Sequence, residues 1–399
     1  IHVLVPLRDN LVQYPRFMAV YPFSLAMLPG ILLGGAWMWL GFVVIYGVMI
    51  LGDESLGDYY EEPAYRHPRL LNSLLYFALP ALFVVGVAMA WMAGSGDLFG
   101  FGAWAQANLG LDLFARREAT APWHWLGAIL SAGITFAALG TNIGHELTHR
   151  TTDRGAMVAG RWLLAITFDA EFAIEHVYGH HRRLATPADP ASARRGEHFY
   201  AYLLRSVFGQ TKSAFELERN RLQTLGHGTW SLHNRYLRGW LMSALIVAAF
   251  GLAAGPKGVV IFVLAALAGR SVLEAVNYFE HYGLVRDPDQ PVEPRHSWNS
   301  NKRLSNVMLF NLARHSHHHA QGDAQFWQLR AYRDAPTLPY GYLTCMLLVF
   351  LLPGWYRNRM TPLLLDWDRQ FATTNERRLA AAANRASGVP ALQLAAQGH

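Results

Sequence analysis

Residues 124–149 read HWLGAILSAGITFAALGTNIGHELTH, an apolar run that ends in two histidines and a glutamate. The run from 124 to 145 is long enough to cross a bilayer, which takes about 20 mostly apolar residues. His145 and His149 are four residues apart, so they share one face of a helix. The spacing H-E-x-x-H is typical of zinc metalloproteases, in which the glutamate is the general base. The sequence therefore predicts a metal site at a membrane edge, with a protease as the first hypothesis.

The composition is that of a membrane protein. Of the 399 residues, 52% are hydrophobic and only 16% are charged, whereas about a quarter of the residues of a soluble protein are charged. The sequence predicts an all-α fold with six transmembrane helices and a helical cap on the cytoplasmic side that holds a histidine-rich di-metal site. The predicted spans are about 17–34, 36–52, 71–94, 124–145, 239–255 and 257–278. The apolar stretch 341–355 is too short to span and is predicted to be interfacial or buried.

The distribution of basic residues predicts the orientation of the chain. The connection 95–123 carries only Arg116 and Arg117, whereas the segment 149–238 and the chain after residue 281 are rich in arginine. With six spans both basic segments lie on one side, and the excess of positive charge assigns that side to the cytoplasm. We expect residues 1–375 to form one membrane-embedded domain and 376–399 to be a tail or linker.

Charge and cysteine content narrow the classes of function. The net charge of +6 suits anionic lipid headgroups or an acidic partner, and no feature indicates nucleic-acid binding. The single cysteine, Cys345, excludes an intrachain disulfide and a cysteine-based metal cluster. Any metal in this chain is therefore expected to be held by histidines.

Three further histidine motifs follow the first one. They are EHVYGHHRR at 175–183, NYFEHYG at 277–283 and NLARHSHHHA at 311–320. Helical spacing places His176 and His180 on one face, and likewise His315, His318 and His319, whereas the adjacent pairs 180/181 and 318/319 can diverge toward two metals. Nine histidines are too many for one tetrahedral zinc and suit two metal ions with four or five imidazoles each. His317 is predicted to face away from its neighbours.

The four motifs together resemble those of the membrane-bound non-haem di-iron alkane 1-monooxygenases, the AlkB type, within the fatty-acid desaturase/hydroxylase-like superfamily. The stretches LATPADPASARRGE (184–197) and HSWNSN (296–301) also resemble that family. The resemblance implies two non-haem iron ions. It implies as their ligands His145, His149, His176, His180, His181, His281, His315, His318 and His319.

The resemblance also implies a reaction and a location. The expected reaction is the O2-dependent terminal hydroxylation of medium-chain n-alkanes to primary alcohols. Electrons are expected from rubredoxin, either separate or fused beyond residue 399, and its NAD(P)H-dependent reductase. The expected location is the bacterial cytoplasmic (inner) membrane, in contact with the lipid bilayer, with the active site on the cytoplasmic side and no nucleic-acid partner.

Further site residues are predicted around the ligands. Histidines that bind metals usually donate their second N–H to a carboxylate or carbonyl, so we expect a supporting shell of Glu146, Glu175, Glu280, Asn142 and Asp53. The resemblance indicates Ile45, with Tyr46 nearby, as residues of the substrate channel. A docking surface for the electron donor is expected to comprise Arg150, Arg154, Arg182, Arg183, Arg194 and Arg195.

Several alternatives remain open at this stage. A related membrane di-iron enzyme acting on xylene or on fatty-acyl chains, or a desaturase, uses the same chemistry. A membrane zinc protease and a histidine-rich metal transporter are alternatives from other classes, although a transporter is expected to place its ligands near the middle of the membrane. The metal content of the purified protein separates these classes.

Overall fold

The computed structural model describes residues 13–397, and most of these are helical, with two isolated β-bridges and no β-strand among them. Within this part of the chain, five helical elements are long and apolar enough to cross a membrane. They are Pro15–Leu33, Gly35–Leu56, Pro68–Ala93, Pro122–Thr148 and Arg235–His281. The first four coincide with the predicted spans 17–34, 36–52, 71–94 and 124–145.

These elements consist of shorter helices joined end to end. The first contains η2 (Pro15–Ala19), α1 (Val20–Leu25) and α2 (Met27–Leu33). The second contains η3 (Gly35–Trp39) and α3 (Leu40–Leu56), and the third α4 (Pro68–Tyr76) and α5 (Ala78–Ala93). The fourth contains η5 (Pro122–His124), α8 (Trp125–Thr135), η6 (Phe136–Thr141) and α9 (Asn142–Thr148).

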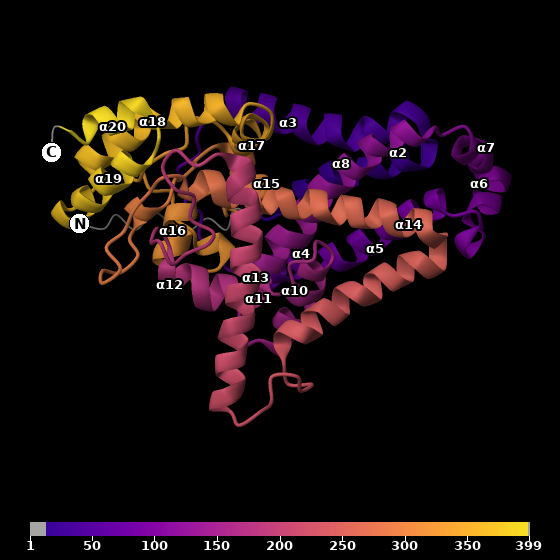
Figure 1. The fold of residues 1–399 in the computed structure, drawn as a ribbon. Coiled ribbons are helices and arrows are strands. Elements are labelled where there is room, and N and C mark those ends of the chain that lie inside the picture. Colours follow the sequence, from indigo (N-terminus) through magenta and orange to yellow (C-terminus); the bar gives the residue numbers. More distant parts are fainter. Residues whose placement is uncertain (1–12, 398–399) are drawn as a thin grey trace.

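The predicted spans 239–255 and 257–278 belong to one element, α14 (Arg235–His281). Gly255, at φ 64° and ψ −162°, is not helical and divides α14 into two arms. Glycine adopts this conformation without the clash that a Cβ would cause, and Pro256 fits the first turn of the second arm because it needs no N–H partner there. Figure 1 shows α14 turning back on itself at the end farthest from the chain termini.

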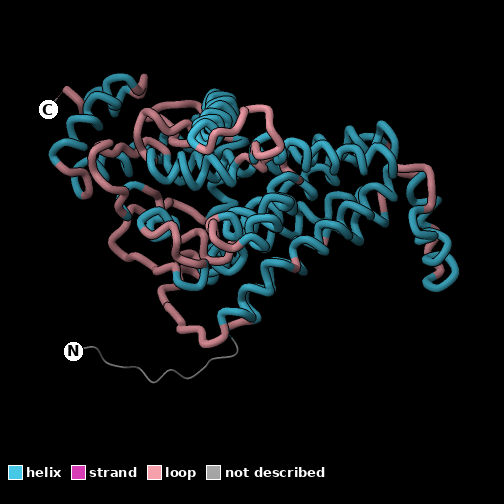
Figure 2. Tube along the Cα trace, turned by 90° about the horizontal axis from the view of Figure 1, so that it is seen from below, coloured by secondary structure: helices cyan, strands magenta, loops and turns pink. Residues whose placement is uncertain are grey.

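Shorter helices gather at one end of the long ones, on the left in Figure 1. This cap consists of α10 (Arg154–Ala165), α11 (Phe172–Glu175), η7 (His176–His180), α12 (His181–Arg183), α13 (Phe199–Thr224), η8 (Pro294–His296), α15 (Arg303–Met308), α16 (His315–Ala320), η9 (Phe326–Gln328), α17 (Tyr342–Leu351) and α18 (Pro353–Gln370). The opposite end carries η4 (Leu98–Gly100), α6 (Phe101–Leu109) and α7 (Leu113–Glu118). The tube in Figure 2, seen from below, shows the same division.

Within the stretch 376–399 that we expected to be a tail or linker, the structure places helices as far as Ala395. They are the end of α19 (Thr374–Ala386) and α20 (Pro390–Ala395). Glu376 is fully buried and accepts hydrogen bonds from Arg295 and His296. Asn384 accepts one from Arg195, which also donates to the carbonyl of Gly283, two residues after His281. The C-terminal helices thereby support the segment that follows His281.

Small residues bring the histidine-bearing helices close to their neighbours. A Cβ on Gly144 would lie 2.9 Å from the carbonyl oxygen of Gly160 in α10, and one on Gly133 would lie 2.7 Å from the Cβ of Ala268 in α14. Glycine at such crossings lets helix backbones approach closely, which is a common packing mode in membranes. Two close contacts therefore hold the fourth spanning element, which carries His145 and His149.

Candidate metal centre

His145 and His149 lie where the fourth spanning element changes its winding. Residues Phe136–Thr141 form a π-helical turn directly before α9, a feature that is frequent at functional sites. Beyond it, the Nε2 atoms of His145 and His149 are 3.0 Å apart. The prediction that this pair shares one face is confirmed.

The rings of His176 and His180, predicted to share one helix face, stack with their centroids 5.1 Å apart, but the two histidines belong to different clusters and do not serve one metal. Residues His176–His180 are π-helical, and in this winding the backbone hydrogen bonds join residue i to residue i+5 rather than i+4. The Nε2 atoms of His176 and His181 accordingly approach to 3.0 Å, whereas His180 joins a different group of histidines. The adjacent residues His180 and His181 therefore belong to two different clusters, as we predicted for this pair.

Five histidines converge in a first cluster, which we call site A: His145, His149, His176, His181 and His318. The Nε2 atom of His145 lies 2.8 Å from that of His176 and 3.1 Å from that of His318. A neutral imidazole carries a single N–H, so His145 cannot donate to all of its neighbours, and nitrogen lone pairs face one another. A cation between them removes this repulsion, so the donor set of site A fits a bound metal ion.

A second cluster, which we call site B, combines two groups that share His281: His180, His281 and His319, and Glu280, His281 and His315. The rings of His315 and His319, one from each group, are 4.4 Å apart. The Nε2 atom of His315 is 3.2 Å from that of His281 and 3.2 Å from Oε2 of Glu280. Both ring nitrogens of His319 and the Nε2 of His180 are buried without a hydrogen-bond partner. Unpaired buried nitrogens are costly, and a metal ion would satisfy them.

The nine predicted ligands therefore all meet in two adjacent clusters. The adjacent pair 318/319 diverges between them, as predicted, and His317 belongs to neither cluster, its ring instead lying 5.4 Å from that of Tyr332. Glu280, which we expected to support a ligand, is placed among the possible ligands of site B. The sequence showed that Glu280 precedes His281, but it did not show that the Glu280 side chain points toward site B.

Burial favours the form of imidazole that binds metals. Desolvation, with some contribution from neighbouring histidines, lowers the pKa of His149 to about 4. The same two causes hold the pKa of His181, His318 and His319 well below the usual value. A metal ligand must be the neutral ring, so these side chains are in the required state at neutral pH without the loss of a proton.

Asp189 supports site B and was not predicted. Its Oδ2 lies 2.9 Å from Nδ1 of His180 and accepts a hydrogen bond from Ser192. A carboxylate on the nitrogen opposite the metal fixes the orientation of the ring. Asp189 lies in the stretch 184–197, which resembles the corresponding sequence of the family. That resemblance was the one feature of the sequence that could have indicated a role for Asp189.

Replacing Asp189 with alanine is expected to weaken metal binding at site B by about 10- to 100-fold, the usual effect of losing such a partner. Titration of the metal-free protein with metal measures this. Asp334→Ala, at an exposed aspartate, is the matched control and is expected to bind as the parent does. Equal affinities in both variants would contradict the role of Asp189.

The other predicted supporting residues lie close to the site but contact other groups. Glu175 accepts hydrogen bonds from Arg183 at 2.8 and 3.1 Å. Glu146 accepts one from Arg150 at 3.0 Å, and Asp53 accepts two from Ser305 at the start of α15. Asn142 lines the pocket beside His145, and its side-chain nitrogen is buried without a partner. Glu146, Glu175 and Asp53 thus hold the surrounding helices rather than the imidazole rings.

The six arginines predicted to form a docking surface do not form a single exposed set. Arg195 is 4% exposed and pairs with Asp368 at 2.6 Å, so it cannot belong to such a surface. Arg150 and Arg183 are half-buried in their ion pairs with glutamates. The exposed members are Arg154, Arg182 and Arg194.

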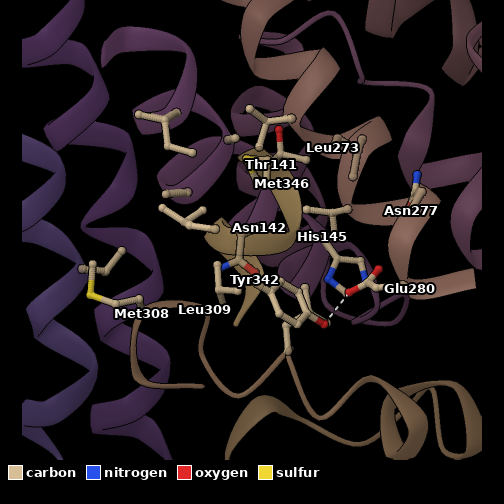
Figure 3. A pocket seen from close by; sticks show the side chains of 18 of the residues that line it. Thr141, Asn142, His145, Leu273, Asn277, Glu280, Met308, Leu309, Tyr342 and Met346 are labelled. Carbon is tan, nitrogen blue, oxygen red and sulfur yellow. Dashed lines mark hydrogen bonds between the residues drawn. The ribbon is translucent and has the colours of Figure 1, made fainter. Parts of the chain in front are cut away.

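An apolar pocket leads to both clusters (Figure 3). At the histidine end it is lined by His145, His176, Glu280 and His315, and Ile45 and Met49 of α3 contribute to its wall. Figure 3 shows Tyr342 pointing toward Glu280, to which its hydroxyl donates at 2.7 Å. Ile45 is therefore a pocket residue. Tyr46 lies behind the wall and donates to the sulfur of Met346, which lines the pocket.

Comparison with known proteins identifies the family. The model of the fatty acid desaturase family matches residues 120–378, a segment that contains all four histidine motifs. The chain belongs to this family of membrane enzymes.

Individual relatives assign the chain to a group within this family. The chain is 34% identical to alkane 1-monooxygenase 1 of Alcanivorax borkumensis over 343 residues, which cover 83% of this chain and 79% of that protein. It is 41% identical to an alkane 1-monooxygenase of Acinetobacter baylyi over 238 residues, 56% of this chain and 57% of that protein. It is also 30% identical to the xylene/toluene monooxygenase hydroxylase component of Pseudomonas putida over 367 residues, 91% of this chain and 92% of that protein. Within the desaturase family the chain belongs with the alkane 1-monooxygenases.

Proposed function

We propose that this chain hydroxylates the terminal methyl group of medium-chain n-alkanes. The balanced reaction is R–CH3 + O2 + 2 e⁻ + 2 H⁺ → R–CH2OH + H2O. The observation that carries the proposal is the apolar pocket that ends against ligands of both clusters: His145 and His176 of site A, and Glu280 and His315 of site B. A long apolar molecule in this pocket would present one end to both metals.

The metals are proposed to be two non-haem iron ions. Site A offers five imidazoles, and site B offers four imidazoles with one carboxylate. Imidazole and carboxylate ligands suit iron, whereas a structural or catalytic zinc site has four ligand positions in all. When bound, the irons would supply the redox chemistry with O2 that attack on an unactivated C–H bond requires.

The pocket residues would bind and orient the substrate. An alkane has no polar group, so its recognition rests on burial, worth about 0.8 kcal/mol for each methylene. Side chains such as Val276, Leu309 and Leu343 line the pocket and exclude water from the histidine end. The hydrogen bond from Tyr342 holds the Glu280 carboxylate in place beside His315.

We propose that the chain crosses the membrane six times, with each arm of α14 crossing once. The break at Gly255 and the length of Arg235–His281, 47 residues, support this reading. The arginine-rich cap would then lie on the cytoplasmic side of the bacterial inner membrane. The domain, which we expected to end at residue 375, would also include α19 and α20, because Glu376 and Asn384 accept hydrogen bonds from Arg295, His296 and Arg195.

Rubredoxin, separate or fused, is proposed as the electron donor, with its NAD(P)H-dependent reductase. Two ligands of site A, His149 and His181, are partly exposed, whereas the described ligands of site B are buried. Arg182 next to His181 and Arg154 after His149 are exposed cations near that edge. An acidic partner would therefore find positive charge where the metal centre is closest to the surface.

Product analysis tests the proposal. The purified protein in lipid vesicles, supplied with rubredoxin, its reductase and NADH, is given octane, dodecane or p-xylene. We expect 1-octanol or 1-dodecanol, and two irons per chain. Hydroxylation of p-xylene alone would favour the second candidate, a xylene hydroxylase, which the similarity to the Pseudomonas putida protein over most of both chains supports. Zinc without hydroxylation of any of these would refute both.

Replacing Ile45 with tryptophan is expected to shift substrate preference toward shorter alkanes, because the larger side chain shortens the pocket that Ile45 lines. Relative rates across a series from hexane to hexadecane measure the shift. Val43→Trp is the control, because Val43 lies on the same helix but is 61% exposed and outside the pocket. An unchanged profile for Ile45→Trp would exclude this residue as a determinant of chain length.

A further inference from the structure

Helix α13, Phe199–Thr224, contributes no residue to either metal cluster. It stands at a steep angle to the arms of α14 in Figure 1 and is seen end-on in Figure 2. One face packs on the bundle and buries Tyr202, Gln210 and Glu218. Outside this face, the residues of the helix are exposed or half-buried.

This exposed surface divides into two strips of opposite character. Tyr200, Leu204 and Phe208 are 49%, 62% and 71% exposed and lie four residues apart, and Phe215 continues their line. Beside it, in the C-terminal half of the helix, lies a polar strip that comprises the exposed Lys212, Arg219 and Gln223 and the half-buried Glu216. A helix with adjacent apolar and charged strips is suited to the boundary between hydrocarbon and water.

At each of its two ends, the apolar strip of α13 adjoins further exposed apolar side chains from other elements. The Tyr200 hydroxyl donates to the carbonyl of Phe350 at 2.7 Å, and Leu351 and Trp355 beyond it are 71% and 48% exposed. At the other end, the ring of Phe215 lies 6.3 Å from that of Trp230 and 5.5 Å from that of Tyr236.

From there the surface runs onto the first arm of α14. Trp240, Leu241 and Leu245 on that arm are 39%, 57% and 52% exposed. These residues belong to an element long and apolar enough to cross the membrane. The apolar strip of α13 is therefore continuous with a surface that faces lipid.

We propose that α13 lies in the plane of the membrane, with its apolar strip among the acyl chains of the leaflet on the side of the cap. This inference rests on the proposed membrane crossing. The polar strip faces water, and Trp230 and Trp240 lie at the depth of the headgroups, where tryptophan is enriched. Lys212 extends its ammonium group to the aqueous side.

This placement has a consequence for the metal centre. Arg183, two residues after His181, donates to Ser213 of α13 at 2.6 Å, and Gln210 donates to Glu274 of α14 at 2.8 Å. α13 therefore connects the membrane surface to α12, which directly follows His180, and to α14, which carries Glu280 and His281 of site B. Its contact with lipid sets the depth of the clusters, so that the pocket opens at the level of the acyl chains where alkanes dissolve.

Spin labelling in vesicles tests the placement. The one cysteine, Cys345, is buried, so a thiol-specific nitroxide is expected to react at introduced cysteines alone, and the unlabelled parent checks this. The variants are Leu204→Cys and Phe208→Cys on the apolar strip, and Arg219→Cys and Gln223→Cys on the polar strip. The full chain is reconstituted in vesicles of phosphatidylethanolamine and phosphatidylglycerol. Power saturation then compares access of oxygen with access of a water-soluble nickel chelate.

We expect labels at 204 and 208 to be relaxed more by oxygen, and labels at 219 and 223 more by the nickel chelate. Access of the nickel chelate to both strips would overturn the proposal, because α13 would then lie in water. Protection of 204 and 208 from both reagents would also overturn it, because protein, such as a second copy of the chain, would cover the strip. Val84→Cys, at an exposed position of α5, reports separately whether the spanning helices are in lipid.

Discussion

The His281→Ala variant is expected to lose the metal ion of site B and all turnover. His281 is fully buried at the end of α14, and its ring faces His180, His315 and His319 of the same cluster. Removal of the ring takes away one ligand and leaves a space beside the others that water can enter. Site A contains no atom of His281, so its metal is expected to remain. Metal analysis should therefore show about half of the parent content, in keeping with two sites of independent ligand sets.

The control for this experiment lies in the last histidine motif. His317 is 2% exposed and is flanked by ligands of both sites, but belongs to neither cluster. His317→Ala removes a buried imidazole of the same size and is expected to keep both metals and most of the activity. Full metal content and parental activity in His281→Ala would remove His281 from the ligand set. Equal loss in both variants would indicate that only the folding of the cap was disturbed.

The Gly179→Ala variant is expected to destabilise the cap and reduce metal binding at both sites. Gly179 stands in the π-helical turn between His176 and His180, under the ion pair of Glu175 and Arg183. A Cβ on this residue would overlap the carboxylate of Glu175 and the guanidinium of Arg183. Since Glu175 is completely buried, separating it from Arg183 leaves a buried carboxylate without its partner, a change that costs about 3–5 kcal/mol.

Two measurements test the effect of Gly179→Ala on the cap. The melting temperature of the purified variant is expected to fall by several degrees, and metal content is expected to decrease at site A and site B together, because the turn holds ligands of both. Gly47→Ala is the control, since a Cβ on Gly47 of α3 would meet no atom within 4 Å. Equal melting temperatures and equal metal contents in Gly179→Ala and Gly47→Ala would contradict the prediction. The ion pair of Glu175 and Arg183 would then not be what maintains the π-helical turn.

Much of the molecule was predictable from local properties of the sequence. Hydropathy located the five apolar elements that are long enough to cross a membrane, although it divided the last of them into two predicted spans. Helical spacing correctly paired His145 with His149. The number of histidines and the absence of a cysteine cluster indicated two imidazole-rich metal sites, which the two clusters bear out as possible metal-binding groups.

The direction of individual side chains depended on winding and on contacts between distant segments. His176 joined His181 rather than His180 because the turn that carries them is π-helical. Arg195 became buried because Asp368 and Asn384, far along the chain, fold over it. Asp53 contacts Ser305 of α15 instead of the histidines.

The sequence by itself determined which residues can bind metal and which segments can lie in a membrane, because both follow from residue type and short-range spacing. The tertiary structure decided which site each histidine serves, that Glu280 joins the ligands of site B and that Asp189 orients His180. The physical reason is that a metal site is completed by side chains from segments more than a hundred residues apart. Their relative orientation is set by helix packing and by local changes in winding, and periodicity within one segment carries no information on either.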